Sequence, residues 1–592
     1  MKIRYLNGRR LYFAVLAGGN AVIEDQSYLN KINVFPVPDA DTGTNLASTM
    51  RAIADGAEAH VSIKATLKSI ANAALSGARG NSGLIFAQFI HGVSKEIGHE
   101  PRLTTHAFAE SVRRAVHYAH KAIVHPAEGT MITVIRDWAE SVYQWRTRTS
   151  DFVELMTESL QTARTSLKET TQKLQALAKA GVVDAGAKGF VDFLEGILHY
   201  IKKGQLAKPQ KAEIFWAQDE IKTPAKDKSL EFRYCTEALL TGTTLDPDMI
   251  RSVVQRFGES AVVAGSEEKV RIHVHTNRPD ELFFELKDHG LMSQIKADDM
   301  RRQYEAAYER KSRIAIVTDS ACDVPPGVVD ERQINLIPLI LSFGDQQFLD
   351  KVTIRPDQFY VLQETSPLQP RTSVPPVMMA MNLFSFLASH YDSIIVITLS
   401  DKLSGVYSMC VQAASQLQGK TISVINSKNI SACSGLLVTK ACAMAEAGAS
   451  HDEIVRTIEA AVPKTRLFVD VATMKYFVRS GRVSPVKGVI GRLLKVKPII
   501  TVDESGKATE GGKSLSRKTN MAKILAKIRK RGSEQEVEGY AVVHARNAER
   551  AALYGKRLTE ILGREPAYIM DVAPVIGVHT GPGTVGIALL YK

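Results

Sequence analysis

The chain has 592 residues, of which 45% are hydrophobic and 23% are charged. This length exceeds what one hydrophobic core supports and predicts two to four domains, while the composition excludes a generally disordered chain. No stretch approaches the ~20 apolar residues that span a bilayer, and the N-terminal segment lacks the cleavage pattern of a signal peptide. The five scattered cysteines suit a reducing cytoplasm better than a disulfide framework.

The formal net charge of +12 suggests an anionic partner. Such a charge attracts nucleic acid or an anionic membrane surface. The basic residues are spread along the chain, however, without a recognition helix, a zinc finger or an aromatic RNA-binding signature. We therefore expect no nucleic-acid partner. Transient contact with a membrane surface is the better of the two interpretations, and a weakly positive surface with no such role is the simplest.

Helical periodicity dominates the first 200 residues. Apolar residues recur at intervals of three and four, as in Ile63, Leu67, Ile70 and Ala74, which is the spacing of one helix face. No run with the period of a strand interrupts these segments. The pattern predicts an all-helical bundle over residues 1–203.

The pattern changes twice after this bundle. Residues 204–229 are rich in lysine, contain two prolines and show no sustained periodicity, which is typical of a linker. Residues 230–310 predict a small α/β domain with a helix between two strands. From 313 to 592, short buried runs alternate with helical segments, which predicts an α/β domain around a mostly parallel sheet.

The segment NVFPVPDADTGTN (33–45) has the residue types of a site for Mg²⁺ and phosphate. Two prolines hold the chain extended before Asp39 and Asp41, and the next residues open a helix. Closely spaced carboxylates suit Mg²⁺, a hard cation that leaves positions open for phosphate, and backbone amides at a helix start bind phosphate oxygens. A helix start capped by Asp41 and Thr42 would explain these residues without a metal.

A second glycine-rich element, GARGNSG (77–83), follows one amphipathic helix. Its small residues would let the backbone approach a polyphosphate closely. An ordinary turn between two helices is the alternative for this motif alone. Neither element is a P-loop, because the sequence contains no G-x-x-x-x-G-K-[ST].

These two elements, followed by HPAEGTMITV (125–134) and AGVVDAGAKGF (180–190), resemble the dihydroxyacetone kinase L-subunit family. Within that family they are most similar to the N-terminal domain of bacterial fatty acid kinase. The resemblance covers roughly residues 8–200. It implies a DhaL-like helical barrel that holds ATP and two Mg²⁺ ions.

The resemblance also implies roles for individual residues. Asp39 and Asp41 would be the catalytic carboxylates and, with Asn33, the ligands of Mg²⁺. The residues implied at the nucleotide are Thr42, Gly43, Asn45, Asn81, Ser82, Gly83, Thr130, Met131, Asp184 and Gly186. One departure is Ala40, where fatty acid kinases commonly have glycine. Alanine is small enough for this position unless the backbone needs a positive φ.

Cys235, His273 and His275 form a candidate metal site in the middle domain. The histidines lie two residues apart in a predicted strand, so both imidazoles project from one face. With Cys235 on a neighbouring strand they would supply three ligands to Zn²⁺ and leave one position open. A buried cysteine beside two surface histidines is the alternative. The segments YCTEALLTG, VRIHVHTNRPDEL and IKADDMRRQ resemble the middle domain of fatty acid kinase, which implies the metal site.

The last 280 residues resemble the DegV family of fatty-acid-binding proteins, which implies two α/β subdomains. The matching segments are RIAIVTDSACDVP (313–325), PRTSVPPV (370–377), TLSDKLSGVYSM (398–409), KYFVRSGRVS (475–484), LLKVKPIITVD (493–503) and VIGVHTGPGTVGIALLY (575–591). A fatty acid requires a deep apolar cavity for its tail and a few donors for its carboxylate. The residues implied at the carboxylate are Thr372, Ser373, Ser404, Gly405, His579 and Gly581.

Three further residues of this half matter for the expected reaction. Val406 replaces the threonine usual in LSGT and so removes one donor near the carboxylate. Arg482 and Arg517 align with basic positions that face the kinase where the two proteins are separate chains. They would guide docking or stabilise phosphate, and a solvated surface charge is the alternative for each.

Together the resemblances predict a cytoplasmic bacterial enzyme that transfers the γ-phosphoryl group of ATP to a long-chain fatty acid held by the same chain. The product would be acyl phosphate for phospholipid metabolism. The expected partners are a second copy of the chain in a homodimer and an acyltransferase that uses acyl phosphate. One alternative is a fatty-acid-binding or transfer protein with a regulatory nucleotide-binding domain. A second is a dihydroxyacetone-type kinase that acts on a small substrate.

Overall fold

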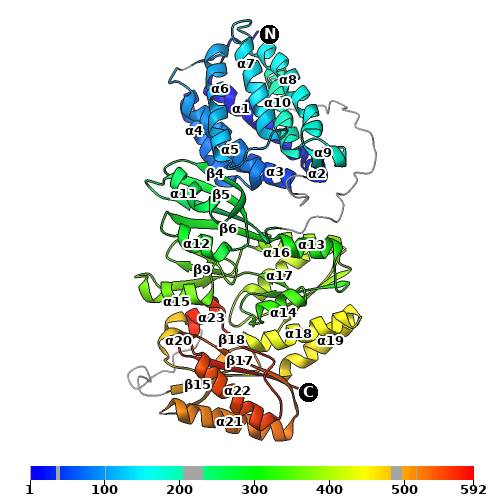
Figure 1. Ribbon diagram of the computed structural model, residues 1–592, viewed down its shortest axis with the longest axis vertical. Helices are drawn as coiled ribbons and strands as arrows, with labels where there is room; N and C mark the ends of the chain where they lie inside the picture. The colour runs from blue at the N-terminus through cyan, green and yellow to red at the C-terminus, as the bar shows by residue number, and fades with distance from the viewer. Residues whose placement is uncertain (1, 35–40, 101, 205–230, 482–496, 515) are drawn as a thin grey trace. The chain divides into compact units, whose positions relative to one another are not determined.

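The computed structural model describes residues 2–34, 41–100, 102–204, 231–481, 497–514 and 516–592. These residues divide into two compact units, which Figure 1 draws as a ribbon. Unit 1 consists of residues 1–278 and 285–300, and unit 2 consists of residues 279–284 and 301–592. Asp39, Ala40, Arg482 and almost all of the predicted linker lie outside the described residues. None of the described helices is both long and apolar enough to cross a membrane.

The N-terminal part of unit 1 is helical, as the apolar periodicity predicts. Its helices are α1 (Gly8–Glu24), α2 (Gln26–Lys31), α3 (Thr42–Gly56), α4 (Ile63–Gly77), α5 (Gly80–Glu96), α6 (Thr105–Ala122), α7 (Met131–Trp145), α8 (Phe152–Lys173), α9 (Gln175–Ala180) and α10 (Ala185–Lys203). Side-chain oxygens begin several of them: Ser62 caps α4 and Asp151 caps α8. The predicted face of Ile63, Leu67 and Ile70 is buried.

Contacts between helices close this helical domain into a ring. The order of neighbours is α1, α3, α4, α5, α6, α7, α8 and α10, and α10 packs again on α1. The expectation that no strand occurs here is wrong in one detail, because β1 (Tyr5–Leu6) and β2 (Leu103–Thr104) form a short antiparallel pair. Two residues per strand are too few to produce a recognisable alternation.

The middle domain of unit 1 is an antiparallel sheet in the order β4-β5-β3-β6. Its elements are β3 (Tyr234–Thr241), α11 (Pro247–Gln255), β4 (Gly258–Gly265), β5 (Lys269–Thr276) and β6 (Leu291–Asp299). The two predicted strands and the helix between them are β3, β5 and α11. The sheet packs on α4 and α5, and Val262 and Ala264 of β4 belong to the core of the helical domain. The two domains therefore share one hydrophobic core.

Unit 2 contains a parallel sheet in the order β13-β12-β7-β8 and a smaller antiparallel sheet in the order β10-β9-β11. Their strands are β7 (Ile314–Asp319), β8 (Asn335–Ile337), β9 (Ile340–Phe343), β10 (Gln346–Leu349), β11 (Pro370–Ser373), β12 (Ser393–Thr398) and β13 (Thr421–Asn426). The run NLIPLIL, predicted as one strand, is divided between β8 and β9. The proline in its middle cannot donate to a ladder, and the chain passes there from one sheet to the other.

The third sheet of unit 2 corrects the expectation of mostly parallel strands. Its order is β16 (Ala508–Ser514), β15 (Lys497–Val502), β14 (Thr465–Asp470), β19 (Val585–Tyr591), β17 (Val537–His544) and β18 (Ile569–Asp571). Only β17 and β18 are parallel neighbours in this sheet, and its other pairs are antiparallel. A buried apolar run reports that a strand is covered on both faces, but it does not report the direction of the neighbouring strand.

Helices cover both faces of the sheets in unit 2. They are α14 (Pro326–Glu331), α15 (Pro356–Thr365), α16 (Val377–His390), α17 (Val406–Ser415), α18 (Ala432–Glu446), α19 (His451–Ala461), α20 (Lys475–Ser480), α21 (Arg517–Glu534), α22 (Ala548–Leu562) and α23 (Pro574–Thr580). In Figure 1, α21 and α22 lie below the third sheet and α18 lies above it. Helix α18 also contacts β7 and β12, and its mostly small and apolar residues suit a helix buried between two sheets.

Candidate functional site

The candidate nucleotide site begins at the start of α3. Asp41 occupies the N-cap position before Thr42, yet its side chain accepts no cap hydrogen bond. Capping therefore does not explain this carboxylate. Asn45, within the first turn of α3, lies against Gly80 at the start of α5, where a Cβ atom would come within 2.4 Å of Nδ2 of Asn45. The backbone at Gly80 has φ +59°, so glycine is favoured there for two reasons.

Further contacts connect the start of α5 to α10 and α7. A Cβ atom at Gly186 would lie 2.5 Å from Oγ of Ser82, so α10 begins against the first turn of α5. Asp184 caps α10 by accepting a hydrogen bond from N of Ala187 at 2.8 Å. Its carboxylate also accepts a hydrogen bond from the amide of Met131 at the start of α7. The helices α3, α5, α7 and α10 thus bring their N-termini to one place.

Converging helix N-termini create a site for anions. Each N-terminus carries a partial positive charge, and its first amides bind phosphate oxygens. In the described part of the chain, the amides of Asn81 and Ser82 have no hydrogen-bond acceptor. Oδ1 of Asn81 is likewise buried without a partner there, so a bound ligand would satisfy it. Burial raises the pKa of Asp184 to about 6.

Other residues predicted at the nucleotide have packing or backbone contacts. Position 43 faces a main-chain oxygen of α2, which a Cβ atom at Gly43 would approach to 2.2 Å. A Cβ atom at Gly83 would lie 2.7 Å from Oγ1 of Thr49. Oγ1 of Thr130 donates to a main-chain oxygen at 2.7 Å. Asn33 is buried where the described part of the loop ends. The two glycines therefore allow α2, α3 and α5 to pack closely.

Two charged residues of the middle domain reach this site, and the sequence analysis missed both. Nζ of Lys296, on β6, lies 2.7 Å from Oδ2 of Asp298 and 3.8 Å from Oδ2 of Asp41. Oε1 of Glu237, on β3, accepts a hydrogen bond from N of Gly80 at 2.6 Å. A signal was present, because a carboxylate within the apolar run YCTEALL is unusual and requires a partner.

The predicted Cys-His-His cluster is assembled on two neighbouring strands. The register of β3 and β5 pairs Cys235 with His275, and the ligand atoms of Cys235, His273 and His275 lie within 4.8 Å of one another. The histidines are 4% and 7% exposed, respectively, which excludes the alternative of two surface histidines. Burial, with a smaller effect of His273, lowers the pKa of His275 to about 3. The imidazole of His275 is therefore neutral, as a metal ligand must be.

This cluster fits Zn²⁺ in its donor atoms. One sulfur and two imidazole nitrogens are typical zinc ligands, and a set of three leaves a fourth position open. Nε2 of His273 is buried and has no hydrogen-bond partner among the described residues. Burial raises the pKa of the Cys235 thiol well above its usual range, so binding of a metal would have to release the thiol proton.

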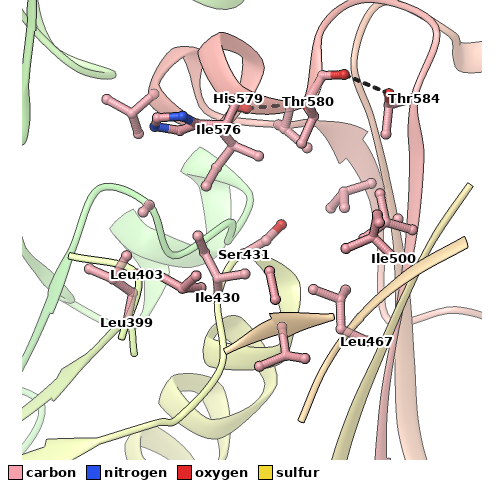
Figure 2. Close-up of a pocket in the computed structure, with 18 of the residues that line it drawn as sticks. Leu399, Leu403, Ile430, Ser431, Leu467, Ile500, Ile576, His579, Thr580 and Thr584 are labelled. Carbon is pink, nitrogen blue, oxygen red and sulfur yellow. Dashed lines mark hydrogen bonds between the residues drawn. The ribbon is translucent and has the colours of Figure 1, made fainter. Parts of the chain in front are cut away.

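In unit 2, a cavity lies between the ends of the parallel strands and one face of the third sheet (Figure 2). Leu399 and Ile430 line it from the loops after β12 and β13, and Leu467 and Ile500 line it from β14 and β15. The lining contains no acidic or basic side chain other than His579 within the described residues. This composition suits an aliphatic chain with a small polar group at one end.

The polar residues of the cavity include half of those predicted at the carboxylate. Thr372, Ser404 and His579 line it, whereas Ser373, Gly405 and Gly581 do not belong to its lining. The sequence analysis missed the hydroxyl groups of Ser431, Thr580 and Thr584, which also line the cavity. Isolated serine and threonine residues carry no signal of their own in a sequence.

Gly581 has a steric role beside the cavity. Its φ is +69°, and a Cβ atom there would lie 2.0 Å from Cδ2 of the Tyr476 ring. Nη2 of Arg517 donates a hydrogen bond to O of Gly583 at 2.6 Å and lies 3.4 Å from Oδ2 of Asp470. The alternative of a solvated surface charge therefore does not describe Arg517, because this side chain holds the G-P-G turn.

Three family models match the chain, one after another. The DAK2 domain matches residues 36–199, the FakA-like middle domain of fatty acid kinase matches residues 231–307, and the DegV family matches residues 313–592. The predicted combination of these three domains in one chain is confirmed. The predicted fold class is confirmed with it: a helical N-terminal domain, a small middle domain with a sheet, and an α/β C-terminal half.

Relatives cover the first half of such a chain, and solved structures cover the second. An uncharacterized protein of Staphylococcus saprophyticus is 32% identical over 316 residues, which are 52% of this chain and 57% of the relative. One of Staphylococcus aureus is 31% identical over 323 residues, which are 53% of this chain and 59% of the relative. The chain thus spans less than two thirds of these relatives. DegV, a fatty acid binding protein from Bacillus subtilis, is 29% identical and covers 48% of this chain and 100% of its own length, with a TM-score of 0.44.

Proposed function

Because this chain carries a DAK2 domain, a FakA-like middle domain of fatty acid kinase and a DegV domain, we propose that it phosphorylates a long-chain fatty acid held by its own DegV domain. ATP is the phosphoryl donor and acyl phosphate is the product. The observation that carries this proposal is the apolar cavity of unit 2, with Thr372, Ser404 and His579 as its polar residues. An aliphatic tail needs such a lining, and a carboxylate needs such donors.

The reaction requires positioning and charge neutralisation more than acid–base chemistry. A fatty acid carboxylate is already ionised near neutrality, so one of its oxygens can attack the γ-phosphorus without a general base. The bond from the γ-phosphorus to the β–γ bridging oxygen breaks, and ADP leaves. Phosphoryl transfer of this kind depends mainly on alignment and on stabilisation of the phosphate charge. The converging N-termini of α3, α5, α7 and α10 support a nucleotide site of this type.

Two Mg²⁺ ions would supply the remaining positive charge at the phosphates. Asp39, Asp41 and Asn33 are the residues that we propose to hold them, and the uncapped carboxylate of Asp41 supports this assignment. We further propose that Cys235, His273 and His275 hold Zn²⁺. Zinc analysis of the purified wild type and of Cys235→Ser tests the zinc site. A stoichiometry near one in the wild type and near zero in the variant is expected, and near zero in both would exclude it.

The fatty acid and the nucleotide must meet for transfer. Fusion of the two modules raises the effective concentration of one around the other when the linkers reach. The transfer takes place either within one chain or between the protomers of a homodimer. A membrane surface as a source of fatty acid, and an acyltransferase that consumes acyl phosphate, complete the proposed cytoplasmic setting.

A trapping experiment tests the proposed reaction. The purified chain is incubated with ATP, Mg²⁺ and palmitate, and hydroxylamine converts any acyl phosphate to a hydroxamate. We expect product from the wild type and from Asp55→Ala, an exposed carboxylate on the same helix α3, and none from the double variant Asp39→Ala/Asp41→Ala. A wild type that binds both ligands but forms no hydroxamate would contradict the proposal. It would favour a fatty-acid-binding protein with a regulatory nucleotide domain.

A further inference from the structure

Glu237 contacts the glycine-rich loop of the helical domain, although it belongs to the middle domain. Its side chain is fully buried on β3. Oε1 accepts a hydrogen bond from N of Gly80 at 2.6 Å, and Oε2 lies 3.1 Å from Nη1 of Arg79. Gly80 is the first residue of α5. The carboxylate thus occupies an anion position at the helix start whose next amides, those of Asn81 and Ser82, face the proposed phosphate site.

The same carboxylate contacts the candidate metal cluster. The register of β3 and β5 places Glu237 opposite His273, and Oε1 lies 3.4 Å from Nδ1 of His273. Nδ1 in turn lies 3.9 Å from Sγ of Cys235. A carboxylate beside a metal-binding histidine commonly fixes the orientation of the ring and tunes the metal. Glu237 combines this position with the cap of α5, so one side chain connects two sites.

The charge of Glu237 gives this connection a sign. Burial by itself would raise the pKa of Glu237, but His273, Lys296 and Arg79 together hold it well below its usual range, so the group is an anion. An anion at the start of α5 repels a phosphate at the same helix start, strongly so in a buried setting. A divalent cation at His273 would offset much of this negative charge and draw the carboxylate toward the cluster.

We propose that Glu237 couples metal binding at Cys235, His273 and His275 to nucleotide binding at the start of α5. A bound divalent cation strengthens phosphate binding by the first turn of α5, and bound nucleotide strengthens metal binding by the same factor, because coupling between two sites is reciprocal. The inference rests on the proposed nucleotide site and is independent of the acyl acceptor.

Calorimetric titration of the full chain with MgADP, before and after removal of zinc by a chelator, tests this coupling. In the wild type, removal of zinc is expected to weaken MgADP binding about 10-fold, within the usual range of coupling between sites. In Glu237→Gln, the amide oxygen still accepts the hydrogen bond of Gly80 but carries no charge. The effect of zinc on this variant is expected to fall below about 2-fold.

One comparison separates coupling from structural damage. Zinc-free Glu237→Gln should bind MgADP more tightly than the zinc-free wild type, because the repelling charge is gone, whereas a merely damaged site would bind it more weakly. Glu268→Gln, at an exposed position in the turn before β5, is the control and should keep the wild-type response to zinc. If circular dichroism shows that the zinc-free wild type unfolds, zinc affinity is measured instead by chelator competition with and without MgADP.

The outcomes distinguish the inference from the proposed function. Equal MgADP affinity of the wild type with and without zinc, or equal zinc affinity with and without MgADP, would overturn the coupling. A wild type that binds no MgADP with zinc bound would overturn the coupling and the nucleotide site together. Intact coupling in a protein that forms no acyl hydroxamate would support this inference and contradict only the proposed acyl acceptor.

Discussion

Nε2 of His579 lies 3.1 Å from Oγ1 of Thr372, although 207 residues separate them along the chain. Thr372 is on β11, whose register places it opposite Leu341 of β9, and His579 is near the end of α23. Contacts between α23 and β11 hold the two side chains together. Both side chains line the cavity (Figure 2), so they form a polar pair that is already in place before a ligand binds, which lowers the entropic cost of binding.

Replacement of this pair should weaken fatty acid binding. His579→Ala removes a donor to a carboxylate, and a hydrogen bond to a charged group contributes about 1.5–3 kcal/mol. Palmitate affinity, measured by displacement of a fluorescent fatty acid, should therefore fall on the order of 10- to 100-fold. Thr372→Val should cause a smaller loss, and Thr365→Val, at an exposed position of α15, should cause none. Unchanged affinity in His579→Ala would remove this residue from the carboxylate site.

A larger side chain in the apolar part of the cavity should shorten the accepted chain. Leu467 lies on the side of the cavity away from His579 (Figure 2). Leu467→Phe would displace about two methylene groups of a long tail, and each buried methylene contributes roughly 0.8 kcal/mol. Palmitate affinity should fall about 10-fold, while the affinity for a 12-carbon acid should fall less than about 2-fold. Equal losses for both acids would indicate general damage and contradict a tail site at Leu467.

Asp470 should be a strong stability determinant of unit 2. Its fully buried carboxylate accepts a hydrogen bond from Nε of Arg550 at 2.6 Å and pairs with Arg517. Asp470→Ala leaves two arginines without this buried counter-charge, which typically costs about 3–5 kcal/mol. Differential scanning calorimetry should show a lower Tm for one transition.

A surface pair provides the contrast for Asp470. Nε of Arg313 lies 2.7 Å from Oδ2 of Asp392, with both side chains largely exposed. Asp392→Ala should cost less than about 1 kcal/mol. If the two variants had equal Tm values, the buried network around Asp470 would not stabilise the fold in the way that its geometry indicates.

Asp350 should make the stability of unit 2 depend on pH. Burial, only partly opposed by Lys351, raises the pKa of its carboxyl group to about 7. The folded state therefore holds the proton more tightly than the unfolded state, so the stabilisation is complete near the unfolded pKa and is lost as pH rises through about 7. Relative to Asp350→Asn, the wild type should lose about 1.4 kcal/mol between pH 6 and pH 8.

Urea unfolding of both proteins at each pH measures this difference, and Asp345→Asn, at an exposed position, is the control. The asparagine can still accept the hydrogen bond from N of Val575, which is 3.1 Å from Oδ1 of Asp350. A difference between wild type and Asp350→Asn that does not change with pH would show that this carboxyl group is ionised throughout the range.

Local patterns in the sequence were sufficient for most elements and for the type of each site. The four-residue and three-residue spacing of Ile63, Leu67 and Ile70 reports one buried helix face, and these residues are indeed buried. The two-residue spacing of His273 and His275 places both rings on one side of β5, close to Cys235. Such inferences succeed because periodicity depends on the geometry of one segment alone.

The sequence by itself therefore determined the three domains, the positions of most helices and strands, and the residue types at the nucleotide, metal and lipid sites. Only the tertiary structure decided the antiparallel order of the third sheet, the pairing of His579 with Thr372, and the hydrogen bond of Glu237 to Gly80, 157 residues earlier. The physical reason is that periodicity and composition report how deeply a segment is buried, whereas the identity of its neighbour depends on how distant segments pack. A single sequence carries little local record of that choice.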